Sequence, residues 1–217
     1  MKLDVVKRRY VAFSDEDRGR YIFHLLPVIC LLLSSFFSLA LSAQGLSEQE
    51  IIQKMASAAE KIKTVQCNFT QTKNLKMMSK EMVSKGKMYC QQPEKLRWEY
   101  TTPRQSTLIL DGTHARLTKD GAEDGTRNKF IGEMARMIMN SVAGKCLTDS
   151  KSFQVTAKEL PTEYVATILP LRKEMKRLYT KLVLHFDIKQ STVTEVELYE
   201  KNGDRTVIEL HDIQINK

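Results

Sequence analysis

The sequence lacks the residue patterns that usually identify an enzyme. The histidines beyond residue 43 lie on predicted strands, and none belongs to a Gly-x-Ser-x-Gly or Cys–His signature: His114, His185 and His211. No glycine-rich phosphate-binding loop is present. Carboxylate pairs such as Glu195 and Glu197 fall on a strand face that is expected to be solvated, where nothing is predicted to raise their pKa values. We therefore expect that the chain is not an enzyme.

Metal-binding spacings are absent as well. No Cys-x-x-Cys or His-x-x-x-His pair occurs, so neither a metal nor another cofactor is expected, and the cysteines beyond residue 43 are far apart: Cys67, Cys90 and Cys146. If the chain turns back as a hairpin near Met78 and Ser79, Cys67 and Cys90 lie opposite each other on one face. A disulfide between them is then possible in an oxidising compartment. The alternative is two small buried side chains, and the pattern does not decide between the two.

The first 43 residues have the composition of a secretory leader. Residues 1–22 are polar and basic, Phe23–Leu41 is an almost uninterrupted apolar run, and small residues precede Gln44. This order predicts a signal peptide over residues 1–43 and a mature domain over residues 44–217. Because the apolar run is long, an uncleaved membrane anchor is the alternative. With cleavage, the protein is expected in the periplasm.

The bulk composition is that of one folded domain. Hydrophobic residues make up 42% and charged residues 28% of the 217 residues, which excludes a disordered chain. The formal net charge is +8, but no run of like charge exceeds three residues. This excess indicates a lysine-rich solvated surface, with an anionic membrane surface or an acidic partner as the alternative. Nucleic acid is not an expected ligand, because aromatic and basic residues are not grouped.

Two helices and a series of strands are predicted. Ser47 and Glu50 form a capping box at the start of the first helix, and the second is expected over Phe130–Val142. A polar loop is expected at Asp120–Gly125. Ten segments have the period-2 alternation of strands: Val65–Lys73, Gly86–Gln91, Leu96–Tyr100, Thr107–Leu110, His114–Lys119, Phe153–Lys158, Tyr164–Leu169, Tyr179–Ile188, Thr194–Glu200 and Arg205–Ile215.

These strands follow one another without βαβ alternation, so an antiparallel sheet is predicted. Pro93 and Pro103 interrupt the ladder, and Asp111-Gly112 and Asn202-Gly203 are hairpin dipeptides. In the last strand the apolar positions change phase, which predicts a β-bulge near His211-Asp212. We expect an α+β domain that is mainly β, with one curved antiparallel sheet of about ten strands and helices covering its concave side.

An ordered set of residues resembles the periplasmic outer-membrane lipoprotein carriers of the LolA type: Phe69-Thr70-Gln71, Gly86, Pro93, Leu96-Arg97-Trp98-Glu99-Tyr100, Pro103 and Asp111-Gly112. The resemblance implies an unclosed β-barrel with helices as a lid, and binding of lipoprotein acyl chains. It also implies an inner-membrane lipoprotein-releasing transporter and an outer-membrane acceptor as partners; a monomer is expected. The chain departs from the family at Gln92, where the carriers commonly have a basic residue before the first proline.

A lipid-binding cavity is expected between the sheet and the helices. Nine methionines occur beyond residue 43, and their unbranched, polarisable side chains suit a hollow that accepts acyl chains of varied shape, although methionine is also common in an ordinary core. Arg97 alternates with Leu96 and Trp98, so it points into the cavity if their face is the outer one, and is a surface arginine otherwise. The residues assigned to the cavity are Phe69, Met88, Arg97, Trp98, Met134, Met137, Ile138, Leu184 and Phe186.

The sequence thus predicts a periplasmic carrier that shuttles lipoproteins from the inner to the outer membrane. One alternative is a sensing or interaction domain on the same scaffold, which binds a protein partner through an exposed sheet edge. Another is a carrier of free lipid or glycolipid. Cleavage of the leader and release of the mature domain would favour a carrier over the interaction domain.

Overall fold

The computed structural model describes residues 45–78, 80–112, 114–119, 122–123, 136–137, 139–141 and 143–217. The chain divides into two units, Met1–Gly45 and Leu46–Lys217, and the described residues belong almost wholly to the second unit, which has its own hydrophobic core. Among these residues, no helix combines the length and the apolar character needed to cross a membrane.

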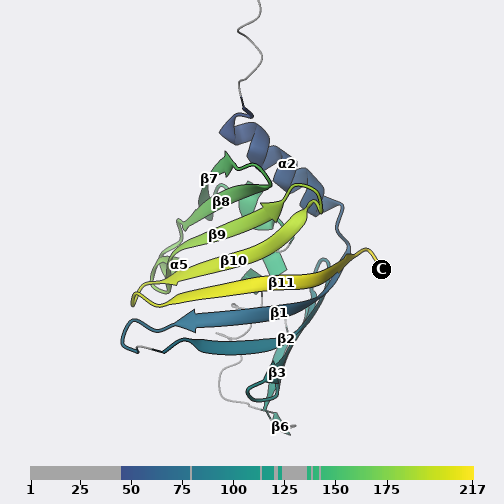
Figure 1. The fold of residues 1–217 in the computed structure, drawn as a ribbon, viewed down its shortest axis with the longest axis vertical. Coiled ribbons are helices and arrows are strands. Elements are labelled where there is room, and N and C mark those ends of the chain that lie inside the picture. The colour runs from purple at the N-terminus through teal and green to yellow at the C-terminus, as the bar shows by residue number, and fades with distance from the viewer. Residues whose placement is uncertain are drawn as a thin grey trace, which may run out of the picture. The chain divides into compact units, whose positions relative to one another are not determined.

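One antiparallel sheet of eleven strands makes up most of the second unit (Figure 1). Its strand order is β6-β5-β4-β3-β2-β1-β11-β10-β9-β8-β7, so β1 and β11 pair in the middle of the sheet. Within the described residues β6 does not pair with β7, and the sheet is therefore not closed into a barrel. The bounds are β1 Thr64–Asn74, β2 Met82–Gln91, β3 Lys95–Thr102, β4 Ser106–Asp111, β5 His114–Lys119, β6 Ala122–Glu123, β7 Phe153–Glu159, β8 Glu163–Pro170, β9 Tyr179–Asp187, β10 Thr192–Glu200 and β11 Arg205–Ile215.

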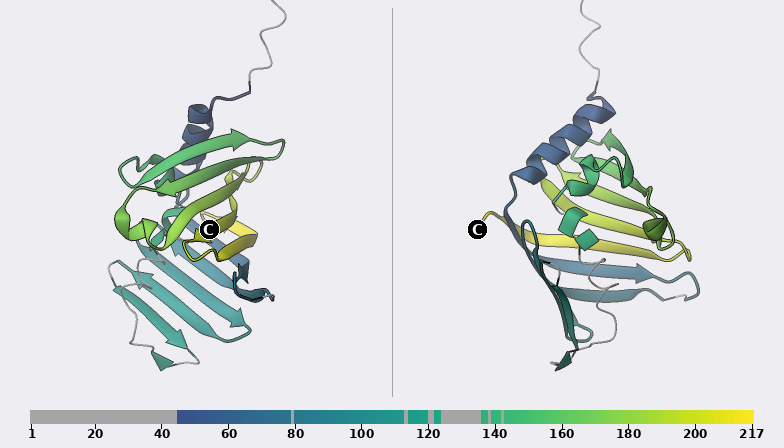
Figure 2. Two further views of the ribbon diagram at one scale, coloured as in Figure 1. Left: turned by 90° about the vertical axis from the view of Figure 1, so that its left-hand side faces the viewer. Right: turned by 180° about the vertical axis from the view of Figure 1, so that it is seen from behind.

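Helix α2 (Glu48–Glu60) lies across the concave side of the sheet and contacts β7, β8 and β10 (Figure 2). The predicted capping box is confirmed: the backbone N–H of Glu50 donates to Oγ of Ser47 at 3.4 Å, and the backbone N–H of Ser47 donates to Oε2 of Glu50 at 2.8 Å. Ile51 and Met55 are buried. The helix therefore starts at a satisfied N-terminus and contributes apolar side chains to the core.

Shorter helical segments complete this layer. Residues 136–137 and 139–141 are helical, and the rest of the predicted helix Phe130–Val142 lies outside the described residues. Helix α4 (Lys145–Thr148) contacts α2, and α5 (Lys173–Lys176) lies between β8 and β9 in the chain. Together with the eleven-stranded sheet, these segments confirm the predicted fold class.

Alternation along each strand divides the side chains between two faces. On β9, Leu182, Leu184 and Phe186 are buried in the core, whereas Lys181 and His185 are only partly buried. We call the helix-covered side the inner face and the opposite side the outer face. The structure contains all ten predicted strands. Each of them was predictable because apolar and polar residues alternate over at least four positions.

The predicted hairpin and bulge near the C-terminus are confirmed. Gly203 has a φ of 93° in the turn between β10 and β11, a conformation that favours glycine. In the pairing of β11 with β1, one extra residue of β11 lies between two consecutive pairs, and Asp212 there has a φ of 53°. The bulge keeps Ile213 and Ile215 packed against the core despite the change of phase in the sequence.

The predicted loop over Asp120–Gly125 is wrong in part. Ala122–Glu123 form strand β6, which pairs with Thr118 and Lys119 of β5. A strand of two residues is too short to show an alternation, so it has no signal in the sequence.

The disulfide between Cys67 and Cys90 that the sequence leaves open is not formed, because both are free thiols. In the β1–β2 hairpin Cys67 is paired with Met88, and Cys90 is paired with Val65. The turn is centred one residue earlier than expected, and this displacement moves the register of an antiparallel hairpin by two residues. Both side chains are buried, as the alternative interpretation had it.

Gly86 allows an unusually close approach of three strands. A Cβ at this position would overlap the carbonyl oxygen of Glu99 on β3 and would lie 2.5 Å from the ring of Phe69 on β1. With no side chain in the way, the Phe69 ring stacks on Trp98 with centroids 4.0 Å apart. Tyr100 meets the same ring edge-on at 5.3 Å. Glycine is therefore required here for packing rather than for a special backbone conformation.

We expect Gly86→Ala to lower the free energy of unfolding by about 2–3 kcal/mol, because the added methyl group must displace either the β3 backbone or the Phe69 ring. Urea unfolding followed by the fluorescence of Trp98, the single tryptophan of the chain, measures this. Ser84→Ala on the same strand is the control and should change stability little. Equal stability of the two variants would contradict the packing role of Gly86.

Candidate functional site

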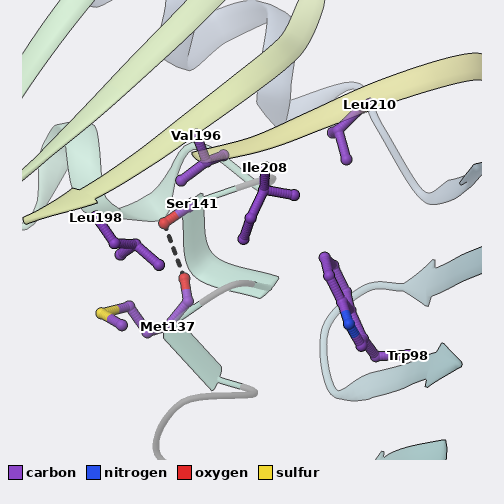
Figure 3. A pocket seen from close by; sticks show the side chains of 7 residues that line it. All are labelled: Trp98, Met137, Ser141, Val196, Leu198, Ile208 and Leu210. Carbon is purple, nitrogen blue, oxygen red and sulfur yellow. Dashed lines mark hydrogen bonds between the residues drawn. The ribbon is translucent and has the colours of Figure 1, made fainter. Parts of the chain in front are cut away.

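An apolar hollow lies between the inner face of the sheet and the helical segment 136–141 (Figure 3). None of the described residues that line it is charged, and they are Trp98, Met137, Ser141, Val196, Leu198, Ile208 and Leu210. The space left empty is about 10 Å³, roughly the room that one water molecule needs. The hollow is therefore almost filled by its own side chains.

Strands β10 and β11 form one wall of this hollow. Val196 and Ile208 are directly paired across the ladder, and Leu198 and Leu210 follow at alternate positions. Each strand therefore turns one apolar row inward.

Trp98 forms the opposite wall from β3, four strands away from β10 in the sheet order. In a flat sheet this separation would be about 19 Å. The curvature of the sheet is what brings Trp98 to the same hollow as Val196 and Leu198.

The helical segment closes the hollow with an apolar side chain. Ser141 is buried, and its hydroxyl donates to the backbone carbonyl of Met137 at 2.9 Å. This bond satisfies the only side-chain hydroxyl among the lining residues within the helix itself. Met137 projects from the same turn toward Leu198 (Figure 3). The segment thus presents no unsatisfied side-chain donor to the hollow from its described residues.

Trp98 is the exception to this apolar lining. Its side chain is fully buried, and its indole Nε1 donates no hydrogen bond to any described residue. A buried N–H without an acceptor costs about 1–3 kcal/mol.

Six of the nine residues assigned to the cavity are buried in one continuous core: Phe69, Met88, Trp98, Met137, Leu184 and Phe186. Of these, Trp98 and Met137 line the hollow. Met134 and Ile138 lie outside the described residues. Contact of the cavity residues with an acyl chain stays a prediction.

Ser141 and four strand residues of the lining were not assigned to the cavity, and the strand residues are Val196, Leu198, Ile208 and Leu210. Their alternation is visible in the sequence, but it identifies only strands with one buried face. Nothing local to these strands indicates that they face Trp98.

The assignment of Arg97 to the cavity is wrong. Leu96 and Trp98 are 2% and 1% exposed on the inner face, so alternation turns Arg97 to the outer face. Its side chain is 53% exposed, and its guanidinium donates to Oε2 of Glu99 at 2.8 and 3.1 Å. Arg97 is a surface arginine.

Three of the methionines also lie away from the hollow. Met77, Met78 and Met82 are 97%, 53% and 53% exposed at the end of the β1–β2 hairpin. The proposal that methionine side chains suit an acyl-chain cavity therefore applies to fewer than the nine methionines counted in the sequence. The buried Met88 and Met137 are among those to which it applies.

The carboxylates Glu195 and Glu197 are less solvated than the sequence suggested. Glu197 is 8% exposed, and although burial opposes its ionisation, hydrogen bonds from Tyr199, His185 and Arg205 hold its pKa below the usual value. Partial burial raises the pKa of Glu195. The expectation of an ordinary solvated face is therefore wrong at this place.

Burial perturbs the core thiols strongly. It raises the pKa of Cys67 to about 12, that of Cys90 to about 11 and that of Cys146 to about 12, from an ordinary value of 9.0. The folded protein therefore holds these protons more tightly than the unfolded chain does. The resulting stability is fully present below about pH 9 and is lost as the pH rises toward 11 and 12.

We expect the free energy of unfolding to fall between pH 9 and pH 10.5, when it is measured by urea titration. In the variant with both Cys67→Ala and Cys90→Ala the fall should be shallower, because two of the three titrating thiols are gone. Parallel pH profiles for the two proteins would contradict the role assigned to these thiols.

Comparisons with known proteins identify related sequences. A family model described as outer membrane lipoprotein carrier protein LolA matches residues 60–217. An outer-membrane lipoprotein carrier protein of Pseudomonas putida (strain W619) is 25% identical over 193 residues, which are 89% of this chain and 88% of the relative. A protein of the same description from Legionella pneumophila (strain Corby) is 27% identical over 191 residues, 86% and 87% of the two chains.

Among solved structures, a LolA superfamily protein from Nitrosomonas europaea superposes with a TM-score of 0.43 and 12% sequence identity, over 80% of this chain and 95% of that one. The family model, in contrast, spans more than half of this chain and includes all eleven strands. The chain therefore belongs to the LolA family of outer-membrane lipoprotein carrier proteins.

Proposed function

We propose that this protein is a periplasmic carrier that binds the acyl chains of lipoproteins and moves them from the inner to the outer membrane. The observation that carries the proposal is the uncharged hollow beneath the helical segment 136–141. The family membership and the descriptions of the relatives support the choice of cargo.

The chemistry of the hollow suits an acyl chain. Each methylene group transferred from water to such a site contributes about 0.8 kcal/mol, without any requirement for directional contacts. The lipoprotein's acyl groups also carry ester and amide carbonyls, and Nε1 of Trp98, which donates to no described residue, offers a donor to one of them.

Loading requires a movement, because about 10 Å³ of free space holds no acyl chain. Val196, Leu198, Ile208 and Leu210 belong to hydrogen-bonded strands near the middle of the sheet. The helical segment with Met137 and Ser141 makes no such ladder, so we propose that it moves away on loading. Return of Met137 to the hollow would then expel the cargo.

The same proposal covers the cellular setting. We propose that residues 1–43 are a signal peptide cleaved on export and that residues 44–217 are the carrier domain, and the separate compact unit Leu46–Lys217 supports this division. A monomer would accept lipoproteins from a transporter in the inner membrane and release them to an acceptor in the outer membrane. A carrier of free lipid, or an interaction domain that uses the edge strand β7, are the competing functions.

The test is a fluorescence titration of the purified protein with lipopeptides that differ only in acyl length, and Trp98 is the reporter. Two extra methylene groups should tighten binding by about 1.6 kcal/mol, or roughly fifteenfold. The unacylated peptide should not bind. Free fatty acid binding as tightly as the lipopeptide would favour the lipid carrier, and no binding by any acylated probe would favour the interaction domain.

Matched variants connect the binding to the hollow. Ile208→Thr should weaken lipopeptide binding several-fold, because it places a hydroxyl group in the apolar lining. Val207→Thr, on the neighbouring outer-face position of β11, and Arg97→Leu should leave binding unchanged. Equal effects of Ile208→Thr and Val207→Thr would place the acyl chain elsewhere.

A further inference from the structure

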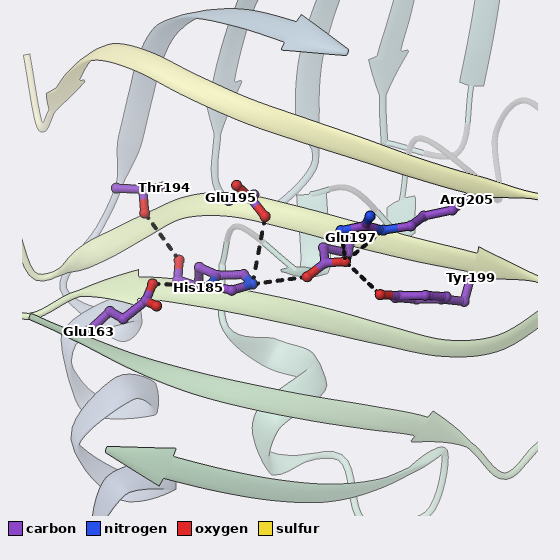
Figure 4. A network of polar contacts seen from close by, with 7 residues as sticks. All are labelled: Glu163, His185, Thr194, Glu195, Glu197, Tyr199 and Arg205. Atoms are coloured by element: carbon purple, nitrogen blue, oxygen red, sulfur yellow. Dashed lines mark hydrogen bonds and ion pairs between the residues drawn. The ribbon is translucent and has the colours of Figure 1, made fainter. Parts of the chain in front are cut away.

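A polar cluster on the outer face, on the side of the sheet away from the hollow, combines residue types that bind transition metals (Figure 4). His185 lies on β9 and is directly paired in register with Glu195 on β10. Glu197 is two residues further along β10 on the same face, and Glu163 reaches His185 from β8. The pairing of three adjacent strands therefore fixes how these side chains lie relative to one another.

The imidazole of His185 meets carboxylates at both of its nitrogens. Nδ1 lies 3.0 Å from Oε2 of Glu163, whereas Nε2 lies 3.1 Å from Oε1 of Glu197 and 3.6 Å from Oε1 of Glu195. The ligand atoms of His185, Glu195 and Glu197 all lie within 4.8 Å of one another. In a tetrahedral zinc site with bonds of about 2.0–2.1 Å, ligand atoms are about 3.3 Å apart. The two distances from Nε2 bracket this value.

The residues around these three ligand atoms would orient them. Once Nε2 has lost its proton, a carboxylate that accepts from Nδ1–H, the position that Glu163 occupies, leaves the lone pair of Nε2 to a metal. The second oxygen of Glu197, Oε2, accepts from the guanidinium of Arg205 at 2.6 and 2.9 Å and from the hydroxyl of Tyr199 at 2.7 Å. These bonds hold the carboxylate with Oε1 directed at His185 (Figure 4).

The charge of the cluster also matches a divalent cation. With a neutral imidazole, the three carboxylates of Glu163, Glu195 and Glu197 outweigh the single positive charge of Arg205 by two. Glu209 lies opposite Glu195 on β11 and adds to the negative potential. A divalent cation bound at Nε2 would compensate the excess of the cluster.

The three ligand side chains are partly exposed to solvent. The side chains of His185, Glu195 and Glu197 are 21%, 30% and 10% exposed. This is enough for a cation to enter and for a water molecule to occupy a fourth position. Three protein ligands with one open position are typical of accessible zinc sites, in contrast to closed structural sites.

We propose that His185 Nε2, Glu195 Oε1 and Glu197 Oε1 bind one Zn²⁺ or a similar divalent transition cation on the outer face of the sheet. The imidazole ligand and the small ligand number favour such a cation over Ca²⁺ and Mg²⁺, which prefer six or more oxygen ligands. Binding displaces a proton from Nε2 and stabilises the folded state by mass action.

The test is calorimetric titration of the purified, untagged protein with ZnCl₂ at pH 7.5, after treatment with a chelator and its removal. One Zn²⁺ should bind per chain, with a matching rise in the melting temperature, while Mg²⁺ and Ca²⁺ should produce no heat of binding. Co²⁺ should give the visible spectrum of a site with nitrogen and oxygen ligands, without the thiolate charge-transfer band that a cysteine site would show. If no Zn²⁺ binds, the cluster is an ion-pair network around a protonated His185 and the proposal fails.

Variants locate the site. His185→Gln should weaken Zn²⁺ binding at least 100-fold, Glu195→Gln at least tenfold, and Glu163→Gln, which acts through His185, about 10–100-fold. The control is His114→Gln on β5, which is exposed and should bind Zn²⁺ as the unaltered protein does. Should His185→Gln fail to fold, the partly exposed Glu195→Gln still decides. Unchanged binding in the folded Glu195→Gln variant would overturn the assignment.

Discussion

The inner face of the sheet depends on the absence of a side chain at Gly86. The ring of Phe69 occupies that space, and it crosses β2 to stack on Trp98 of β3. A residue with a Cβ would separate the ring from the backbone or push β3 away. Trp98 is in turn the only described lining residue of the hollow that comes from the β1–β5 part of the sheet. The shape of the hollow therefore depends on a contact between Phe69 and Trp98, whose strands lie two and four strands away from that of Val196.

Features that depend on a few neighbouring residues were predictable from the sequence. The ten strands, the capping box of α2 and the bulge at Asp212 all follow from local alternation or capping chemistry, and the structure confirms them. The absence of an enzymatic role is confirmed by membership of a family of carriers. The sequence left the state of Cys67 and Cys90 open, because one residue at the turn decides whether Cys67 is paired with Cys90 or with Met88.

Which face of the sheet is covered is a global property. Alternation in the sequence predicted that Leu96 and Trp98 lie on one face of the sheet and Arg97 on the opposite face. It did not indicate which of these two faces the helices cover. The position of the hollow could not be predicted from the sequence for the same reason. The hollow unites Trp98 with residues of β10 and β11 across four strands, and curvature of this extent has no signature in any single strand. The burial of the carboxylates around His185 was not predicted, because it is produced by side chains of neighbouring strands.

The two faces of β9 and β10 connect the proposed sites. Along these strands Leu184 and Val196 point into the core, while His185 and Glu195, their immediate neighbours, belong to the outer cluster. A cation held by both strands would fix their spacing, and with it the wall of the hollow. The wall that an acyl chain would contact is then rigid, since ladder hydrogen bonds already join its strands. In the proposed carrier, space for cargo would therefore come from movement of the helical segment 136–141, which contacts the sheet through apolar side chains such as Met137.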